Sequence, residues 1–151
     1  MTKTIRVWAM TAAVLLAGAA VAVAQSFGTA AEAKAMLEKA VAALKANETE
    51  AIAKFNAKDG GFRDRDLYVF CYNTSDGKFT THPNAALVGT DVRALKVGDD
   101  ALGQRIFDTA KAGAVATVAY NFPKPGTTNP VPKESYVTVV GGQGCGVGYY
   151  K

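Results

Sequence analysis

The chain has 151 residues, with 17 Lys and Arg against 13 Asp and Glu, which gives a formal net charge of +4. This small excess, spread singly along the chain with no basic stripe, excludes a typical nucleic-acid-binding protein. The length suits one domain with its own hydrophobic core.

Residues 1–24 have the pattern of a secretory signal peptide. Lys3 and Arg6 form a basic start, residues 7–23 are an apolar run, and an A-x-A cleavage pattern ends the segment. An uncleaved membrane anchor is the alternative, because the run approaches the shortest length that spans a bilayer. The small residues at its end and the lack of a charged stop favour cleavage. We therefore expect residues 25–151 to form a periplasmic or secreted domain without stable membrane insertion.

Residues 29–56 are rich in Ala, Glu, Lys and Leu and contain no Pro or Gly, which predicts a helix. Leu37 and Leu44 belong to an apolar stripe at helical spacing, and this stripe must pack on the rest of the domain. An N-x-x-E pattern that starts at Asn47 predicts a bend, with a second short helix over residues 48–56.

Residues 67–73, LYVFCYN, are strongly strand-forming, because aromatic and β-branched residues dominate them. Both faces of this strand are apolar, so we expect a central strand that is covered on both sides. Residues 74–77 then form a turn, and residues 78–81 return as a short second strand. Alternation puts Tyr68, Phe70 and Tyr72 on one face of the first strand, with Leu67, Val69 and Cys71 on the other.

A further helix is predicted over residues 101–112, capped by Asp99 or Asp100, because apolar residues recur there at every fourth position. The loop at residues 123–134 holds four of the five prolines, and loops of this length are often functional lids. The order of elements predicts an α+β fold with an antiparallel sheet and a long bent N-terminal helix. Three strands complete it at residues 114–122, 135–140 and 144–150.

The only two cysteines, Cys71 and Cys145, both follow the predicted signal peptide and would meet an oxidising compartment. A disulfide between them would close a loop of about 75 residues and stabilise the fold by about 4 kcal/mol in the chain-entropy model. The alternative is a pair of buried, reduced cysteines that behave as small hydrophobic residues.

Several short motifs occur in a fixed order along residues 25–151. They are Phe55-Asn56, LYVFCYN with the Asp76-Gly77 turn, His82-Pro83, Tyr120-Asn121-Phe122-Pro123, Lys133-x-Ser135-Tyr136-Val137, and the closing strand at residues 144–150. In this order they resemble the single Cache domain, the PAS-like extracellular sensor module of bacterial chemoreceptors and histidine kinases.

The resemblance implies a PAS-like, five-stranded antiparallel sheet whose first and last strands lie side by side, which makes Cys71 and Cys145 neighbours. It also implies a small-molecule pocket between the sheet and residues 82–113, for solutes such as short carboxylates, amides or amino acids. The implied partner is a membrane receptor, kinase or transporter. Two features depart from the family pattern. No transmembrane helix or output domain follows the last strand, so we expect a free-standing exported form, and the closing strand GCGVGYY lacks the usual bulky apolar residue.

A pocket for a small polar ligand needs apolar walls and a few convergent polar groups. The tyrosines offer hydroxyls, and His82 or Lys133 could neutralise a carboxylate. In the alternative interpretation each tyrosine is a core residue with its hydroxyl at the rim, His82 stabilises the turn before Pro83, and Lys133 is solvated. The candidate ligand-binding residues are Tyr68, Phe70, Tyr72, His82, Tyr120, Lys133 and Tyr136.

We expect no catalytic role, metal site or cofactor. Cys71 and His82 could form a thiol nucleophile with its base, but a strand cysteine with a disulfide partner is a poor nucleophile. One histidine, no C-x-x-C and no C-x-x-C-H motif leave neither a zinc site nor a haem site. Two functions remain: an exported domain that binds a small solute, and a structural or interaction protein with a vestigial pocket.

Overall fold

A computed structural model describes residues 26–151, so the expected signal peptide lies outside the described part of the chain. None of the helices in residues 26–151 has the length and apolar character needed to cross a bilayer. The helices are α1 (Ala30–Ala46), α2 (Glu48–Ala57) and α3 (Leu102–Thr109), with 3₁₀ turns at Ala85–Leu87 and Val92–Ala94. The strands are β1 (Arg63–Asp64), β2 (Leu67–Asn73), β3 (Phe79–Thr81), β4 (Ala116–Pro123), β5 (Pro130–Val140) and β6 (Gln143–Tyr150).

All strands pair antiparallel in one sheet of order β1-β2-β6-β5-β4, with β3 paired to β2. The first long strand, β2, therefore lies beside the last strand, β6, as the resemblance implied. This arrangement confirms the predicted α+β fold. The sheet has six strands rather than five, because the two residues of β1 also pair with β2.

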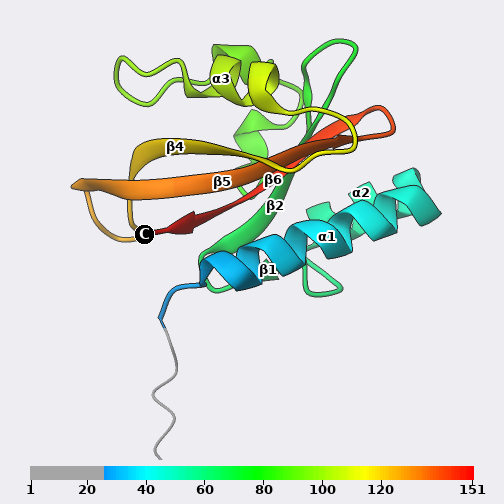
Figure 1. The fold of residues 1–151 in the computed structure, drawn as a ribbon, viewed down its shortest axis with the longest axis horizontal. Helices are drawn as coiled ribbons and strands as arrows, with labels where there is room; N and C mark the ends of the chain where they lie inside the picture. The colour runs from blue at the N-terminus through cyan, green and yellow to red at the C-terminus, as the bar shows by residue number, and fades with distance from the viewer. Residues whose placement is uncertain (1–25) are drawn as a thin grey trace, which may run out of the picture.

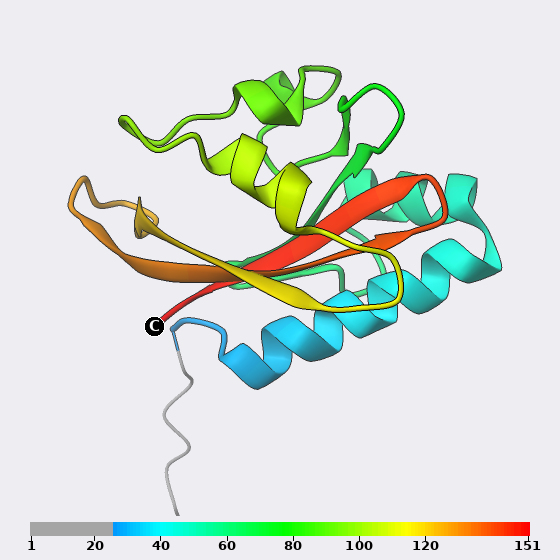
Figure 2. The same ribbon diagram turned by 45° about the horizontal axis from the view of Figure 1, so that its top comes forward.

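The two faces of the sheet are covered by different parts of the chain. Figure 1 shows α1 and α2 on one side of the sheet and α3 on the other, and Figure 2 shows the same layers from a turned view. Leu37, Leu44 and Phe55 belong to the core on the α1 side, together with Val69 and Val147. A second core lies on the α3 side of the sheet. The apolar stripe predicted for the first helix thus packs on the sheet.

The predicted bend between the two N-terminal helices is confirmed at Asn47. This residue ends α1 in an extended conformation, and its side-chain Oδ1 accepts a hydrogen bond of 3.1 Å from the backbone N–H of Glu50. An asparagine at this position satisfies one of the N–H groups that a helix start leaves without a partner. The sequence pattern therefore located both the break and the start of α2.

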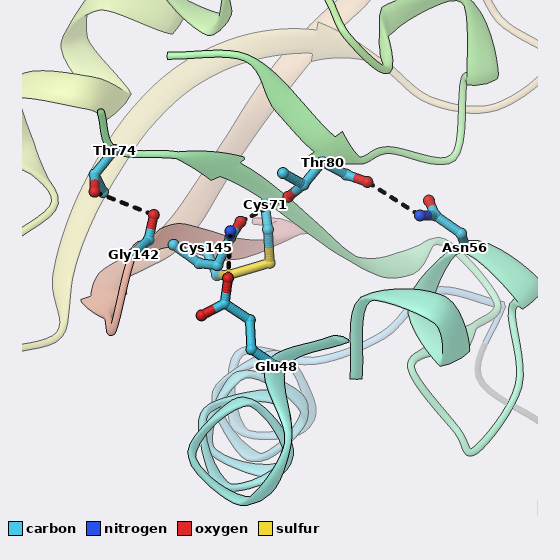
Figure 3. Close-up of a disulfide and its surroundings, with 8 residues drawn as sticks. Glu48, Asn56, Cys71, Thr74, Thr80, Gly142 and Cys145 are labelled. Carbon is cyan, nitrogen blue, oxygen red and sulfur yellow. Dashed lines mark hydrogen bonds between the residues drawn. A yellow bond between two sulfur atoms is a disulfide. The ribbon is translucent and has the colours of Figure 1, made fainter. Parts of the chain in front are cut away.

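Cys71 and Cys145 face each other across β2 and β6 and form a disulfide, with their Cα atoms 4.1 Å apart. Both side chains are fully buried on the α1 side of the sheet. Figure 3 shows Glu48 beneath the disulfide, where its Oε1 accepts a hydrogen bond of 2.9 Å from Gln143. The Oε1 of Gln143 in turn accepts a bond of 2.7 Å from Thr80. The predicted disulfide is thus confirmed, and it lies where α2 meets the sheet.

The glycines of β6 make room for aromatic side chains on the α3 side of the sheet. A Cβ at Gly144 would overlap the ring of Tyr72, and a Cβ at Gly146 would overlap the ring of Phe70. The rings of Tyr72 and Phe70 therefore occupy the space that side chains of β6 would otherwise fill. This explains why the closing strand can lack the bulky apolar residue of the family pattern.

Two predicted boundaries were wrong. The helix predicted at residues 101–112 is shorter and ends at Thr109. The backbone carbonyl of Lys111 accepts a hydrogen bond from the Val139 N–H, so this part of the chain pairs with β5 instead of continuing the helix. No side chain caps its start, since the carboxylate of Asp100 binds Arg105 instead.

The long loop predicted at residues 123–134 was also wrong. β4 and β5 continue pairing as far as Pro123 and Pro130, which leaves only residues 124–129 as the turn. Pro123 and Pro130 are tolerated because they lie where the two strands end, and at strand ends a missing N–H breaks no interior ladder bond. The turn is also held down, because the hydroxyl of Tyr150 donates a 2.6 Å bond to the Pro123 carbonyl.

Candidate functional site

A cavity of about 550 Å³ lies between the α3 side of the sheet and the segment that crosses it. Its floor comes from β2 and β4, and its roof comes from residues 82–106. Gly103 lets α3 approach closely, since a Cβ there would overlap the backbone carbonyl of Val92. The lining residues are Tyr68, Phe70, Phe79, His82, Pro83, Asn84, Leu87, Leu95, Leu102, Ile106, Tyr120 and Phe122.

The structure brings Tyr68, Phe70, His82 and Tyr120 together at this cavity, although they come from three separate segments. Tyr68 and Phe70 point to the same face of the sheet, as the alternation along β2 predicted. The register then places Tyr120 of β4 on that face, directly opposite Lys133 of β5. Four of the predicted residues therefore converge on one space.

Lys133 lies beside the cavity and is almost fully buried, with 2% of its surface exposed. Its Nζ sits among three aromatic rings, 4.4 Å from the ring centroid of Tyr150, 5.2 Å from that of Tyr68 and 5.4 Å from that of Phe122. Tyr68 and Phe122 line the cavity, so the ammonium group lies directly behind its wall. The rings stabilise the cation through their π faces, but no carboxylate of residues 26–151 pairs with it.

Burial makes the charged form of Lys133 less favourable. It lowers the pKa of the ammonium group to about 8, and the nearby carboxylate of Asp66 offsets only part of this effect. Lys133 therefore remains mostly charged at neutral pH without a counter-ion. An unpaired buried cation costs stability, which marks this position as a candidate for ligand binding.

His82 combines both roles that the sequence left open. Its Nδ1 accepts a 3.0 Å bond from the backbone N–H of Asn84, which stabilises the turn, and the ring also lines the cavity. Burial, together with the charge of Lys133, lowers the pKa of His82 to about 4. The ring is therefore neutral at pH 7. Because Nδ1 is an acceptor, the proton lies on Nε2 and the ring offers a neutral donor.

Tyr120 also lines the cavity and carries a hydroxyl. Its Oη lies 2.9 Å from Ser135 Oγ in a hydrogen bond, and burial raises its pKa to about 12. A Cβ at Gly148 would crowd Ser135 Oγ, Tyr120 Oη and the Cε of Lys133. The glycine therefore allows these polar groups to gather at one point of the sheet.

Two predicted residues do not join the cavity. Tyr72 lies on the correct face, but its ring packs 5.5 Å from that of Phe107 and its buried hydroxyl has no partner within residues 26–151. Tyr136 points to the opposite face of the sheet, where it stacks on Tyr149 with ring centroids 5.5 Å apart. Tyr136 was predicted on the pocket side because the sequence does not show which residues of β5 pair with which residues of β4.

Sequence reasoning missed the apolar part of the lining, above all Phe79, Leu95, Leu102 and Ile106. Of these four residues, only Leu102 and Ile106 could have been predicted, because their helical spacing indicates a helix face that packs on the sheet. It also missed Asp66, which is buried, accepts a 2.6 Å bond from the Gly28 N–H and is the carboxylate that acts on Lys133.

The alternative of a Cys71 nucleophile with His82 as its base is wrong. The Cys71 sulfur is bonded to Cys145, and its side chain faces α1 rather than the cavity. In the described part of the chain no three His, Cys, Asp or Glu side chains cluster as a metal site requires.

The fold and sequence have known relatives. A crystal structure of a methyl-accepting chemotaxis protein from Vibrio parahaemolyticus is 23% identical, with 80% of this chain and 86% of that chain covered and a TM-score of 0.62. A periplasmic sensor domain of a chemotaxis protein is 28% identical, with 78% and 86% covered and a TM-score of 0.57. A Cache chemosensory domain, solved for the structural basis of carboxylic acid recognition, is 24% identical, with 78% and 84% covered and a TM-score of 0.56.

No curated protein matches the chain in sequence. The family model described as single Cache domain 2, however, matches residues 3–149, which is nearly the whole chain. This match includes the cavity, the buried lysine and the disulfide described above. The chain therefore belongs to the single Cache domain 2 family.

Proposed function

We propose that this domain binds a small carboxylate in the cavity beside Lys133, outside the cytoplasm, and presents it to a membrane receptor, kinase or transporter. The observation that carries the proposal is the buried, unpaired ammonium group of Lys133 behind the cavity wall. A ligand carboxylate would supply the direct ion pair that Lys133 lacks, since Asp66 offsets the effect of burial only in part.

A buried ion pair is favourable only if further hydrogen bonds satisfy the remaining lone pairs of the carboxylate. Tyr120, Tyr68 and His82 are the groups placed to do so. Tyr120 and Tyr68 offer hydroxyls, whose pKa values are both raised by burial, so both remain protonated donors at neutral pH. His82 offers its Nε2–H. Binding therefore needs one cation and a small set of neutral donors.

The rest of the cavity fits a short organic chain. Phe70, Leu95, Leu102 and Ile106 form an apolar wall that suits the carbon part of the ligand. The volume of about 550 Å³ lies within the usual range for small-molecule sites. Because Lys133 is the one buried cation beside the cavity in residues 26–151, we infer a preference for monocarboxylates over dicarboxylates.

Two of the similar structures support this proposal. One is described as a periplasmic sensor domain of a chemotaxis protein, which agrees with the expected signal peptide and with a periplasmic location. Another is a Cache domain described for carboxylic acid recognition. The rival hypothesis, an interaction protein with a vestigial pocket, predicts that side chains fill this region. An open cavity of about 550 Å³ does not favour it.

Thermal unfolding of ligand-free protein against matched pairs of acids and their amides tests the proposal. A ligand that binds the native state raises the melting temperature with concentration. We expect shifts with short monocarboxylates and none with the corresponding amides, because the amides carry no charge.

Two conservative variants provide the matched control. Tyr120→Phe removes a hydroxyl at the cavity and should reduce the shift, whereas Tyr136→Phe removes one on the opposite face and should leave it unchanged. Equal shifts with acids and amides, or no shift with any acid, would contradict the proposal.

A further inference from the structure

Asp66 is a buried carboxylate that does not belong to the cavity lining. It lies in the turn between β1 and β2 and is 8% exposed. Its Oδ1 accepts a 2.6 Å hydrogen bond from the Gly28 N–H, whereas its Oδ2 is buried with no hydrogen-bond partner in residues 26–151. A buried oxygen without a partner has lost its hydration, so it costs stability unless a nearby opposite charge compensates it.

The segment before α1 holds Asp66 in place. Gly28 is buried, and a Cβ there would overlap the Leu67 side chain, so glycine allows its N–H to come this close to the start of β2. The neighbouring Phe27 packs edge-on against Tyr150, with ring centroids 5.8 Å apart. Figures 1 and 2 both show this segment beside the end of β6. The carboxylate is therefore fixed before any ligand binds.

Asp66 and Lys133 act on the same two aromatic rings. The Nζ of Lys133 lies 4.4 Å from the ring centroid of Tyr150 and 5.2 Å from that of Tyr68. Burial raises the pKa of both phenols, and the charge of Asp66 raises both further, so the carboxylate also lies near these rings. No ion pair joins Asp66 to Lys133 in residues 26–151. Their attraction therefore acts across a gap, where a protein interior screens it only weakly.

We propose that Asp66 is the positioning residue of the carboxylate site. Its buried charge, fixed by Gly28, keeps Lys133 charged and inside the aromatic rings until a ligand carboxylate pairs with it. This inference rests on the proposed function. Asp66 attracts the cation and repels the acid, so it extends binding to higher pH and weakens binding slightly at low pH.

The other titratable groups around Lys133 keep one charge state between about pH 6 and 9. His82 has a pKa of about 4 and is neutral throughout. Arg63 on β1, whose charge acts on Tyr68, stays protonated. Burial raises the pKa values of three phenols above the ordinary 10, and these are Tyr68, Tyr120 and Tyr150. A change of affinity within this window therefore reports on Lys133.

Asp66→Asn tests this role because it removes the charge and keeps the shape. The amide oxygen can still accept the hydrogen bond from Gly28. NMR titration of ligand-free protein with ¹³C-labelled lysine follows the charge of Lys133 directly, and Lys133→Met identifies its signal. We expect the titration midpoint of the variant to lie about one pH unit below that of the wild type. An unchanged midpoint would overturn the proposal.

Calorimetric titration of a short monocarboxylate at about pH 6 and pH 9 measures the effect on binding. At the lower pH, Asp66→Asn should bind at least as tightly as the wild type, because Lys133 is charged in both and the repulsion is gone. The ratio of its affinities at the two pH values should be about tenfold larger than that of the wild type. A variant that loses the same affinity at both pH values would point to structural damage and overturn the proposal.

Asp64→Asn provides the matched control. It makes the same change of charge in the same turn, but the Asp64 side chain is 55% exposed and pairs with Arg65. This variant should keep the wild-type midpoint and affinity ratio, and melting curves check that each variant is folded. If no acid binds the wild type at either pH, the proposed function fails, whereas the NMR midpoints still decide whether Asp66 holds the charge of Lys133.

Discussion

Lys133 is the residue at which stability and the proposed carboxylate binding oppose each other. Its pKa falls from the ordinary 10.5 to about 8 because the folded protein disfavours the charged form. A shift of this size corresponds to about 3 kcal/mol that the empty domain loses by keeping the charge buried. A protein without a binding role would gain from an apolar residue here.

We predict that Lys133→Met stabilises the ligand-free domain by about 1–3 kcal/mol. Methionine fills a similar volume among the three rings and removes the unpaired charge. Urea unfolding of the ligand-free proteins measures this difference, with the exposed Lys96→Met as control, which should show no change. A destabilised Lys133→Met variant would mean that the cation contributes to the fold rather than to binding.

The pH dependence of binding follows from the same residue. Only the charged amine pairs with a carboxylate, so affinity should be constant below pH 8 and fall about tenfold per pH unit above it. The stability of the empty domain should change in the opposite sense and rise between pH 8 and 10.5, because the unfolded chain binds the proton more tightly.

Titrations with a short monocarboxylate between pH 6 and about 10 measure this profile. His82 has a pKa of about 4 and the Tyr120 pKa is about 12, so neither of these cavity residues titrates in this window. Affinity that stays flat across pH 8 would exclude Lys133 as the group that binds the acid.

Sequence reasoning could place Tyr68 and Phe70 on one face because alternation within a single strand is local. It could not place Tyr136. Both faces of this sheet are covered by apolar residues, so the pattern of β5 does not show which of its residues point to which face. The burial of Lys133 was also invisible, since lysines are almost always exposed and the aromatic residues around it come from three other strands.

At the scale of elements, the glycines of β6 leave room for the aromatic rings of β2. We predict that Gly146→Ala destabilises the domain by about 1–3 kcal/mol, because its Cβ would meet both the Phe70 ring and the Tyr136 carbonyl. Gly142→Ala is the matched control, since no heavy atom lies within 4 Å of its added Cβ. Thermal unfolding of both variants measures the difference, and equal stability of the two would show that the ring of Phe70 moves aside freely.

The disulfide between β2 and β6 stabilises the fold but lies on the face of the sheet away from the cavity. Replacing both Cys71 and Cys145 by alanine should lower the free energy of unfolding by about 4 kcal/mol. Carboxylate affinity should be retained at temperatures where the variant is folded, because both sulfurs face α1. Denaturation and ligand titration of the same preparation measure the two effects. A folded variant that has lost affinity would place the disulfide within the binding machinery.

The helix boundaries show why some elements could be predicted and others could not. The bend at Asn47 depends on a local cap, and local sequence specifies it. The end of α3 depends on a backbone bond from Val139 to Lys111, which only the assembled sheet provides. The continuation of β4 and β5 to Pro123 and Pro130 likewise depends on pairing between strands. Tertiary contacts override local propensity at these positions.

At the scale of the whole molecule, the two faces of the sheet carry different features. The face under α1 and α2 carries the disulfide and an open groove beside α1. The face under α3 carries the cavity proposed to bind a carboxylate, and the buried lysine beside it. The order of elements and the resemblance to the Cache family predicted this layered fold, whereas the placement of Tyr120 and Lys133 on the cavity face could be seen only from the registers of β4, β5 and β6.

Calorimetric titration of a short monocarboxylate and its amide into the wild type and Lys133→Met at neutral pH tests the central claim most directly. The ion pair with Lys133 is desolvated, so its removal should lower acid affinity by about 100-fold or more. We predict that the wild type binds the acid far more tightly than the amide, and that Lys133→Met binds both weakly. Equal affinity of the two proteins for the acid would contradict this account.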